Sequence, residues 1–175
     1  VDSAAARILE ELTGLRDIYL EQLYTYGDVK RDEGARVISV AYCALIKIDL
    51  YNESLGNKYN AQWFPIEDVP ELIFDHNIMV DKALRRLQRK SVTQPIGFEL
   101  LNEKFTLTQL QQLYEAIHQK KLDKRNFRKK ILAMDVLQKL TEKDKENSKR
   151  GAFLVRFDKR RYDELAGEGN VFEFK

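Results

Sequence analysis

The sequence predicts a protein of mixed α and β structure (α+β or α/β) in two parts, and two observations lead to this expectation. Residues 105–131 contain two helix-start signals in succession, and residues 151–157 alternate apolar and polar positions as a half-buried strand does. In the first half, helical stretches lie on either side of a long β-rich run at residues 36–48. We therefore expect an α/β domain followed by a helical domain with a small sheet.

Helical and extended segments alternate along the first half. Residues 3–12 are rich in Ala and Leu and stop before Gly14, which is a helix-termination signal. Residues 36–48 are too apolar for a surface strand, whereas residues 49–60 are polar and predict a loop. Residues 77–89 predict a further helix. This pattern is typical of an α/β domain.

The polar stretch that ends in Pro95 and Gly97 predicts the boundary between the two parts. The expected division is a first domain at residues 1–90, a linker at 91–99 and a second domain at 100–175. Charge supports two separate roles: residues 101–175 hold 18 Lys/Arg and 12 Asp/Glu, a net +6, and the remaining 12 Lys/Arg and 16 Asp/Glu give residues 1–100 a net −4.

Residues 105–131 predict two helices, and each begins with a capping signal in the sequence. Thr106 and Gln109 match a capping box, in which each side chain bonds the other residue's backbone N–H. Asp123 predicts a second cap, with Leu122 and Phe127 as the apolar staple around it. Two short, capped helices joined by a tight turn are typical of a helix-turn-helix.

The second of these helices is strongly basic. At 100° per residue, Phe127, Ile131 and Met134 share one face, and Arg125 and Lys129 point away from it. The alternative interpretation is an ordinary solvated helix face, but the basic cluster contains no interleaved acid. We expect the following residues of this helix to contact DNA: Lys124, Arg125, Asn126, Arg128, Lys129 and Lys130.

Residues 136–157 predict the wing of a winged helix-turn-helix. An apolar-rich run at 136–141 and the alternating run at 151–157 enclose a wholly polar loop. Lys149 and Arg150 lie at the end of that loop, where we expect them to contact DNA phosphates. An ordinary hairpin is the alternative. A last helix is expected near residues 159–165.

Bulk composition excludes several classes of protein. No apolar run is long enough to cross a bilayer, and no signal-peptide pattern opens the sequence. The single Cys43 permits no disulfide within the chain and is expected to be a buried thiol. Net charge is only +2, so DNA binding would depend on local contacts. We expect a cytoplasmic bacterial protein associated with the nucleoid and not with a membrane.

Residues 7–15 (RILEELTGL) resemble the second half of a Nudix box, whose pattern is R-E-U-x-E-E-x-G-U with U aliphatic. Segments similar to those that follow the box in this family lie at residues 26–28, 31–32, 36–42, 63–65 and 74–76. With the winged helix, the chain resembles the Nudix-related transcriptional regulators, and in particular their arabinose-responsive branch. The resemblance implies a degenerate Nudix-like α/β sandwich whose first strands precede the sequence shown.

Departures from the Nudix pattern argue against catalysis. Several Glu carboxylates on one helix are needed to hold Mg²⁺ against a pyrophosphate. Glu11 keeps one of these positions, but Ile8 and Leu12 occupy the other two. We therefore expect no catalytic residue, no metal site, no cofactor and no enzyme activity, and we expect this helix face to pack.

The resemblance implies that the first domain senses a small molecule, with L-arabinose as the expected effector. Such a pocket needs hydrogen-bonding side chains and an aromatic or apolar wall. The expected effector-binding residues are Tyr24, Tyr26, Asp28, Arg31, Arg36, Ser39, Tyr42 and Trp63. Each has a structural alternative in the core or in a turn. His76 is expected to be a cap or a structural histidine, and His118 a surface one.

Together these observations predict a sugar-responsive transcriptional regulator. We expect it to be a repressor that L-arabinose releases from operator DNA. Arg125, Asn126, Arg128 and Lys129 would contact base edges, and the other basic residues would hold phosphates. The family implies a homodimer on a palindromic double-stranded site. The alternative is a hydrolase or sensor of ADP-ribose or a related nucleotide with an appended DNA-binding domain.

Overall fold

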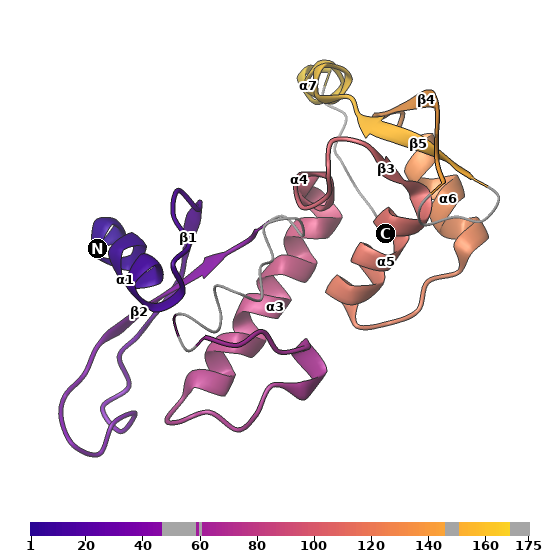
Figure 1. Cartoon of the computed structure of the whole chain (residues 1–175). Coiled ribbons are helices and arrows are strands. Elements are labelled where there is room, and N and C mark those ends of the chain that lie inside the picture. Colours follow the sequence, from indigo (N-terminus) through magenta and orange to yellow (C-terminus); the bar gives the residue numbers. More distant parts are fainter. Residues whose placement is uncertain (47–58, 60, 146–150, 169–175) are drawn as a thin grey trace. The chain divides into compact units, whose positions relative to one another are not determined.

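The computed structural model describes residues 1–46, 59, 61–145 and 151–168 (Figure 1). The chain divides into two compact units, Val1–Arg85 and Arg86–Lys175. Each unit is described by itself below. Within the described residues, no helix is both long and apolar enough to cross a membrane.

The first unit opens with α1 (Asp2–Thr13), the helix that carries the Nudix-like pattern. Gly14 ends it in the left-handed region at φ 73°, with its N–H donating to the carbonyl of Glu10 at 2.8 Å. A Cβ at Gly14 would lie 2.4 Å from the ring of Tyr59, so both the backbone angle and the close approach require glycine. The predicted stop signal is confirmed.

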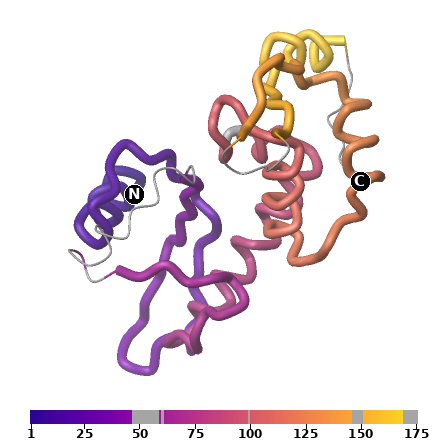
Figure 2. The backbone as a smooth tube through the Cα atoms, turned by 45° about the vertical axis from the view of Figure 1, so that its right-hand side comes forward, coloured from indigo at the N-terminus to yellow at the C-terminus, as the bar shows by residue number. Residues whose placement is uncertain are grey.

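Two antiparallel strands, β1 (Leu20–Tyr26) and β2 (Ser39–Ala44), form the sheet of the first unit as described. Tyr26 pairs with Ser39, and the register shifts between Gln22 and Tyr24. The strand β2 is shorter than the β-rich run predicted at residues 36–48, and every residue of β2 is half-buried. Figure 2 shows the long connection between the two strands as part of the indigo and violet trace.

Residues 91–99 do not form the expected linker. The helix α3 (His76–Thr93) runs into this segment, and α4 (Ile96–Glu99) follows after one short turn. Ser91 is fully buried and Phe98 is 5% exposed, so the segment contributes to the interior of the second unit. The segment with Pro95 and Gly97 is therefore a tight connection between two helices and not a free linker. Apolar contacts within the second unit hold the end of α3 and α4 in place.

The second unit contains the expected helix-turn-helix and wing. Its further elements are β3 (Phe105–Thr106), α5 (Leu107–His118), α6 (Lys124–Ala133), β4 (Leu137–Asp144), β5 (Ala152–Phe157) and α7 (Lys159–Gly167). The strands form one antiparallel sheet in the order β3-β5-β4. The sequence did not predict β3, since two residues show no periodicity.

One apolar core joins these elements. Phe98 stacks on Phe157 with ring centroids 4.6 Å apart, and Tyr114 meets Phe127 edge-on at 5.7 Å. The buried members of the core are Phe98, Phe105, Leu110, Tyr114, Phe127, Ile131, Val136 and Val155. Since burying one such side chain contributes roughly 1.5–3 kcal/mol, this core fixes where α6 sits on α5 and on the sheet.

Candidate nucleic-acid interface and effector site

Both predicted helix caps of the helix-turn-helix are present. The Thr106 hydroxyl accepts the backbone N–H of Gln109 at 3.2 Å, and the Gln109 side chain accepts that of Thr106 at 2.8 Å. The Asp123 carboxylate accepts the backbone N–H of Asn126 at 2.8 Å. The caps confirm where α5 and α6 begin, and with that the angular position of every α6 side chain.

Glu115 locks the turn between the two helices. Its carboxylate accepts the backbone N–H of Leu122 at 2.9 Å, and the nearly buried Gln111 amide donates to both Glu115 and the Leu122 carbonyl. These bonds, with Lys121 at 3.3 Å, lower the pKa of Glu115. Sequence reasoning missed Gln111 and Glu115, because partners seven and eleven residues along the chain leave no periodic signal.

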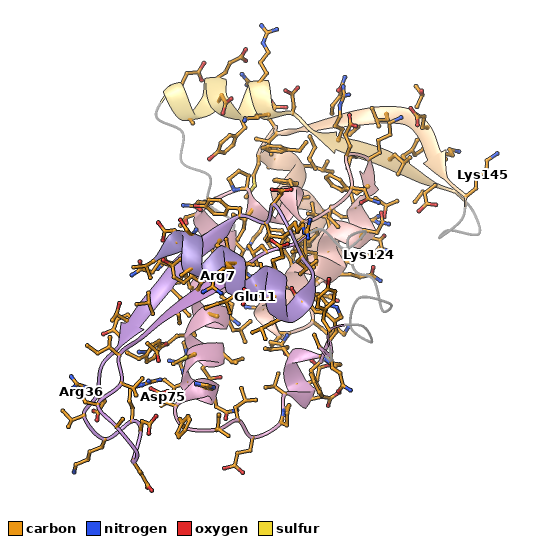
Figure 3. The ribbon with its side chains drawn as sticks, turned by 60° about the vertical axis from the view of Figure 1, so that its left-hand side comes forward. Arg7, Glu11, Arg36, Asp75, Lys124 and Lys145 are labelled. Carbon is orange, nitrogen blue, oxygen red and sulfur yellow. The ribbon has the colours of Figure 1, made fainter. Side chains whose placement is uncertain are left out.

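The faces of α6 agree with the predicted wheel. Phe127 and Ile131 are buried, while Arg125 and Lys129 are exposed on the opposite side. Of the six residues expected to contact DNA on this helix, five are exposed: Lys124, Arg125, Asn126, Lys129 and Lys130. Figure 3 labels Lys124 at the start of the helix. The helix thus presents a basic surface with no acid in its first turn.

Arg128 differs from the other basic residues of α6. It is half-buried, and its guanidinium donates to the Thr108 hydroxyl in the first turn of α5 at 3.4 Å. Its Nε is buried and has no hydrogen-bond partner among the described residues. Arg128 therefore points along the flank toward α5 and not outward with Arg125.

The opposite flank of α6 borders a hollow. Asn126 and Lys130 line it together with His118 and Lys120 at the end of α5, and its volume is about 350 Å³. Asp123 also contributes to the lining, so the hollow carries both signs of charge. Asn126 and Lys130 thus lie on a different side of the helix from Arg128.

His118 connects this region to the end of α3. Its Nε2 lies 3.0 Å from the Ser91 hydroxyl, and its ring stacks on Tyr114 at 6.3 Å between centroids. Tyr114 in turn donates to the Ser91 carbonyl at 3.3 Å. Burial, aided by Lys120, lowers the pKa of His118. The prediction that His118 is a surface residue is therefore wrong, since the ring is half-buried and contacts the end of α3.

The wing adds positive charge beside α6. Lys143 lies across from Phe153, with its ammonium 4.6 Å from the ring centroid, and Phe153 is 59% exposed. Lys145 is exposed at the described end of the hairpin (Figure 3). Lys149 and Arg150, which we expected to contact phosphates, lie outside the described residues, so their role stays a prediction.

In the first unit, four of the eight expected effector-binding residues come together. Tyr24 and Tyr26 meet edge-on at 5.2 Å between ring centroids, and Arg31 donates to the Ser39 hydroxyl at 2.8 Å. Ser39 pairs with Tyr26 across the sheet. The Tyr26 hydroxyl is buried without a hydrogen-bond partner in the described structure.

Two residues that the sequence analysis did not propose complete this cluster. Asp75 accepts two hydrogen bonds from Arg31, at 2.7 and 2.9 Å, which lower the pKa of Asp75. The ammonium of Lys82 on α3 lies 4.1 Å from the Tyr24 ring centroid and 4.6 Å from that of Tyr26. Burial, followed by Asp75, raises the pKa of Tyr26.

Three of the other four expected effector residues make hydrogen bonds within the first unit. Asp28 accepts the backbone N–H of Lys30, and Arg36 donates to the carbonyls of Gly27 and Asp28 in the exposed loop that Figure 3 shows. The Tyr42 hydroxyl donates to Asp2 of α1. Trp63 is 51% exposed. The contact of Asp28 matches the structural alternative considered for it, a role in a turn.

The Nudix-like helix α1 differs from expectation in one respect. Ile8 and Leu12, which we expected to pack, are 46% and 62% exposed. Arg7 and Glu11 form an exposed pair at 2.8 Å along the helix (Figure 3). Among the described residues, no three His, Cys, Asp or Glu side chains gather as a metal site. The expected absence of catalysis remains a prediction.

The geometry places the second unit among winged-helix domains, and comparisons with known proteins agree. Residues 97–157 match the NrtR DNA-binding winged helix domain. Over 163 residues the chain is 34% identical to the "ADPR responsive transcriptional repressor NtrR" of Acinetobacter baylyi, covering 92% of this chain and 65% of that protein. The chain therefore spans just under two thirds of the length of this relative.

Solved structures give the same result for the fold. A crystal structure of Shewanella oneidensis NrtR complexed with a 27-mer DNA is 29% identical, with a TM-score of 0.71, and covers 87% of this chain and 70% of that one. A MutT/nudix family protein from Enterococcus faecalis is 21% identical, with a TM-score of 0.62, over 89% and 68% of the two chains. The predicted fold class, a Nudix-like unit followed by a winged helix, is confirmed.

By these comparisons the chain is similar to the NrtR-type, Nudix-related transcriptional regulators. The comparisons do not support the arabinose-responsive branch expected from the sequence. The effector named for the relative is ADP-ribose, which is closer to our alternative interpretation.

Proposed function

We propose that this chain is a DNA-binding transcriptional repressor whose Nudix-like unit senses ADP-ribose. The observation that carries the proposal is the position of the basic helix α6. Its inner face buries Phe127 and Ile131, and its outer face exposes Arg125 and Lys129. The domain that contains it matches the NrtR winged helix. Similarity to an ADP-ribose-responsive repressor over 92% of the chain supports the effector.

The exposed residues of α6 take different roles in this proposal. Arg125 and Lys129 face directly away from the core, so they would contact base edges when α6 lies in the major groove. Arg can bond guanine with two N–H groups. Lys124 and Lys130 lie nearer the core and would hold phosphates, as would Lys149 and Arg150 of the wing. Asn126 lies at the exposed start of the helix, where it could contact a base edge or a phosphate.

The cluster of Tyr24, Tyr26, Arg31 and Ser39 with Lys82 suits a nucleotide effector. Aromatic faces can stack on a base, and the Lys82 ammonium provides positive charge for a pyrophosphate. Arg31 is already paired with Asp75, so it would position the cluster. A neutral sugar such as L-arabinose would leave the charge of Lys82 unused.

In this proposal the protein acts as a homodimer in the bacterial cytoplasm. The dimer binds a palindromic DNA site. Two recognition helices on one face of DNA would read two half-sites one helical turn apart. ADP-ribose would then release the DNA by favouring a form of the dimer that does not match the half-site spacing. Dimer formation is part of the proposal.

The test begins with duplex DNA selected by the protein from a randomised pool. Binding of the selected duplex is measured by gel shift while ADP-ribose or L-arabinose is added. We expect ADP-ribose to release the DNA and L-arabinose to have no effect. Absence of any selected duplex would refute DNA binding, and release by L-arabinose alone would refute the effector.

A second candidate, hydrolysis of ADP-ribose, is tested in the same samples. The single surviving Glu11 of the box pattern and the apolar Ile8 and Leu12 argue against a Mg²⁺ cluster. With Mg²⁺ present, we expect no release of AMP from ADP-ribose over the time of the binding measurement. Steady AMP formation would make the chain an enzyme.

A further inference from the structure

Arg128 is the exception among the basic side chains of α6, all of which the structure describes. Lys124, Arg125, Lys129 and Lys130 are exposed, whereas Arg128 is half-buried along the flank that faces α5. A residue in this position cannot extend outward with Arg125 without leaving its place beside Thr108.

The hydrogen bonds of the Arg128 guanidinium are incomplete. A guanidinium offers five N–H donors in a fixed plane. Among the described residues, Arg128 makes a single hydrogen bond, the 3.4 Å contact to Thr108, which is longer than the usual range. The Nε donor is buried without a partner. The buried Nε cannot itself reach a partner outside the chain, so an acceptor supplied from outside would bond the amino groups at the end of the guanidinium.

The surroundings select an anionic acceptor. Thr108 lies in the first turn of α5, a helix of 12 residues, and neither α5 nor α6 has an acidic residue in its first turn. Arg128 makes no ion pair with a carboxylate in the described part of the chain, so its charge is not neutralised there. Arginine and phosphate form strong, charge-assisted hydrogen bonds.

We propose that Arg128 and the Thr108 hydroxyl together bind a phosphodiester of the DNA backbone, and that Arg128 does not read a base edge. The inference rests on the proposed function, since it needs DNA as the partner. The phosphate would supply acceptors for the unsatisfied guanidinium and fix how α6 is seated relative to the start of α5. Arg128 thus provides affinity and register, and Arg125 provides sequence preference.

The experiment compares Arg128→Gln with wild type on the selected duplex and on single-base-pair variants of it, over a range of salt concentrations. We expect Kd to rise by about tenfold on every sequence, because one charge-assisted bond is lost. We also expect the slope of log K against log salt to fall by about 0.9, the value for one phosphate contact.

Two matched controls separate this contact from other effects. Arg160→Gln removes the same charge from α7, where Arg160 is 89% exposed and paired with Glu164, and we expect neither Kd nor the salt slope to change. Arg125→Ala should lose affinity mainly for the preferred base pair and keep more of its affinity for variants at that position.

Thr108→Val tests the pairing of the two side chains and covers the case in which Arg128→Gln fails to fold. Thr108 is exposed, so Val should be tolerated there. We expect a smaller rise in Kd, and no additional rise when Thr108→Val is combined with Arg128→Gln, since both remove one site.

Two results would overturn the inference and leave the proposed function intact. A loss in Arg128→Gln confined to particular base pairs would make Arg128 a base reader. A uniform loss with an unchanged salt slope would make it a structural brace. If wild-type protein selects no duplex, the proposed function itself fails, which is a different outcome.

Discussion

The helices α1 and α6 both carry the residues on which a function was predicted, yet they are held in place very differently. α6 begins at a side-chain cap, Asp123, and buries Phe127 and Ile131. α1 has no side-chain cap at its start and no buried residue. Thus α6 has both a side-chain cap and a buried inner face, and α1 has neither in the described structure.

The same contrast holds for the two units. Among the described residues, Tyr26 is the only buried apolar residue of the first unit, and the other nine belong to the second. Large exposed apolar side chains show the reverse distribution, with Leu132 and Phe153 the only two in the second unit. The second unit therefore carries its own stabilising core, whereas the stability of the first should respond weakly to changes on its exposed apolar faces.

The largest expected effect comes from the core of the second unit. Ile131→Ala should lower the free energy of unfolding of that unit by roughly 2–5 kcal/mol, because it empties a fully buried site. Urea unfolding followed by circular dichroism measures it. The single Trp63 lies in the first unit, so its fluorescence reports that unit separately.

Ile8→Ala on α1 is the matched control for this change. Ile8 is 46% exposed, so we expect an effect within about 0.5 kcal/mol. If Ile8→Ala proved as costly as Ile131→Ala, the contrast between the two helices would be wrong.

An intermediate effect is expected from the cap of α6. Asp123→Ala leaves the backbone N–H of Asn126 without its acceptor and should lower stability by about 1 kcal/mol. The start of α6 would fray, so we also expect weaker binding to the selected duplex. Asp123→Asn, which keeps an acceptor, should restore most of the stability, and hydrogen exchange at the start of α6 would show whether fraying is the cause.

The smallest expected effect is a dependence on pH. The pKa of His118 is lowered on folding from an ordinary value of 6.5, so the unfolded chain binds the extra proton more readily. The stability of the second unit should therefore be constant above about pH 6.5 and decline as the pH falls below it toward the lowered pKa. Thermal unfolding between pH 8 and pH 5 measures this decline.

His118→Gln is the control, since it cannot titrate. Its melting temperature should vary less between pH 7 and pH 5 than that of wild type. Asp75 and Glu115, whose pKa values are lowered, contribute at more acidic pH, below their ordinary values of 3.8 and 4.5. An equal decline in both proteins above pH 5 would exclude His118 as the source.

Part of the candidate interface could be predicted from the sequence because it depends on neighbours within one turn of helix. Thr106 with Gln109, and Asp123 with Asn126, act over three residues, and this spacing is visible in the chain. The buried position of Phe127 follows from the same periodicity. Of the cluster that we propose as the effector site, the sequence indicated only some members, since Lys82 is far in sequence from the tyrosines that it contacts.

The sequence by itself determined the two-part organisation, the start of each helix in the helix-turn-helix, and which face of α6 is buried, because local hydrogen bonds and a 3.6-residue period set these features. Only the tertiary structure decided that residues 91–99 belong to the second unit, that Glu115 locks the turn, and that Arg128 lies beside Thr108. Each of these depends on contacts between separate elements, which packing selects and local sequence does not encode.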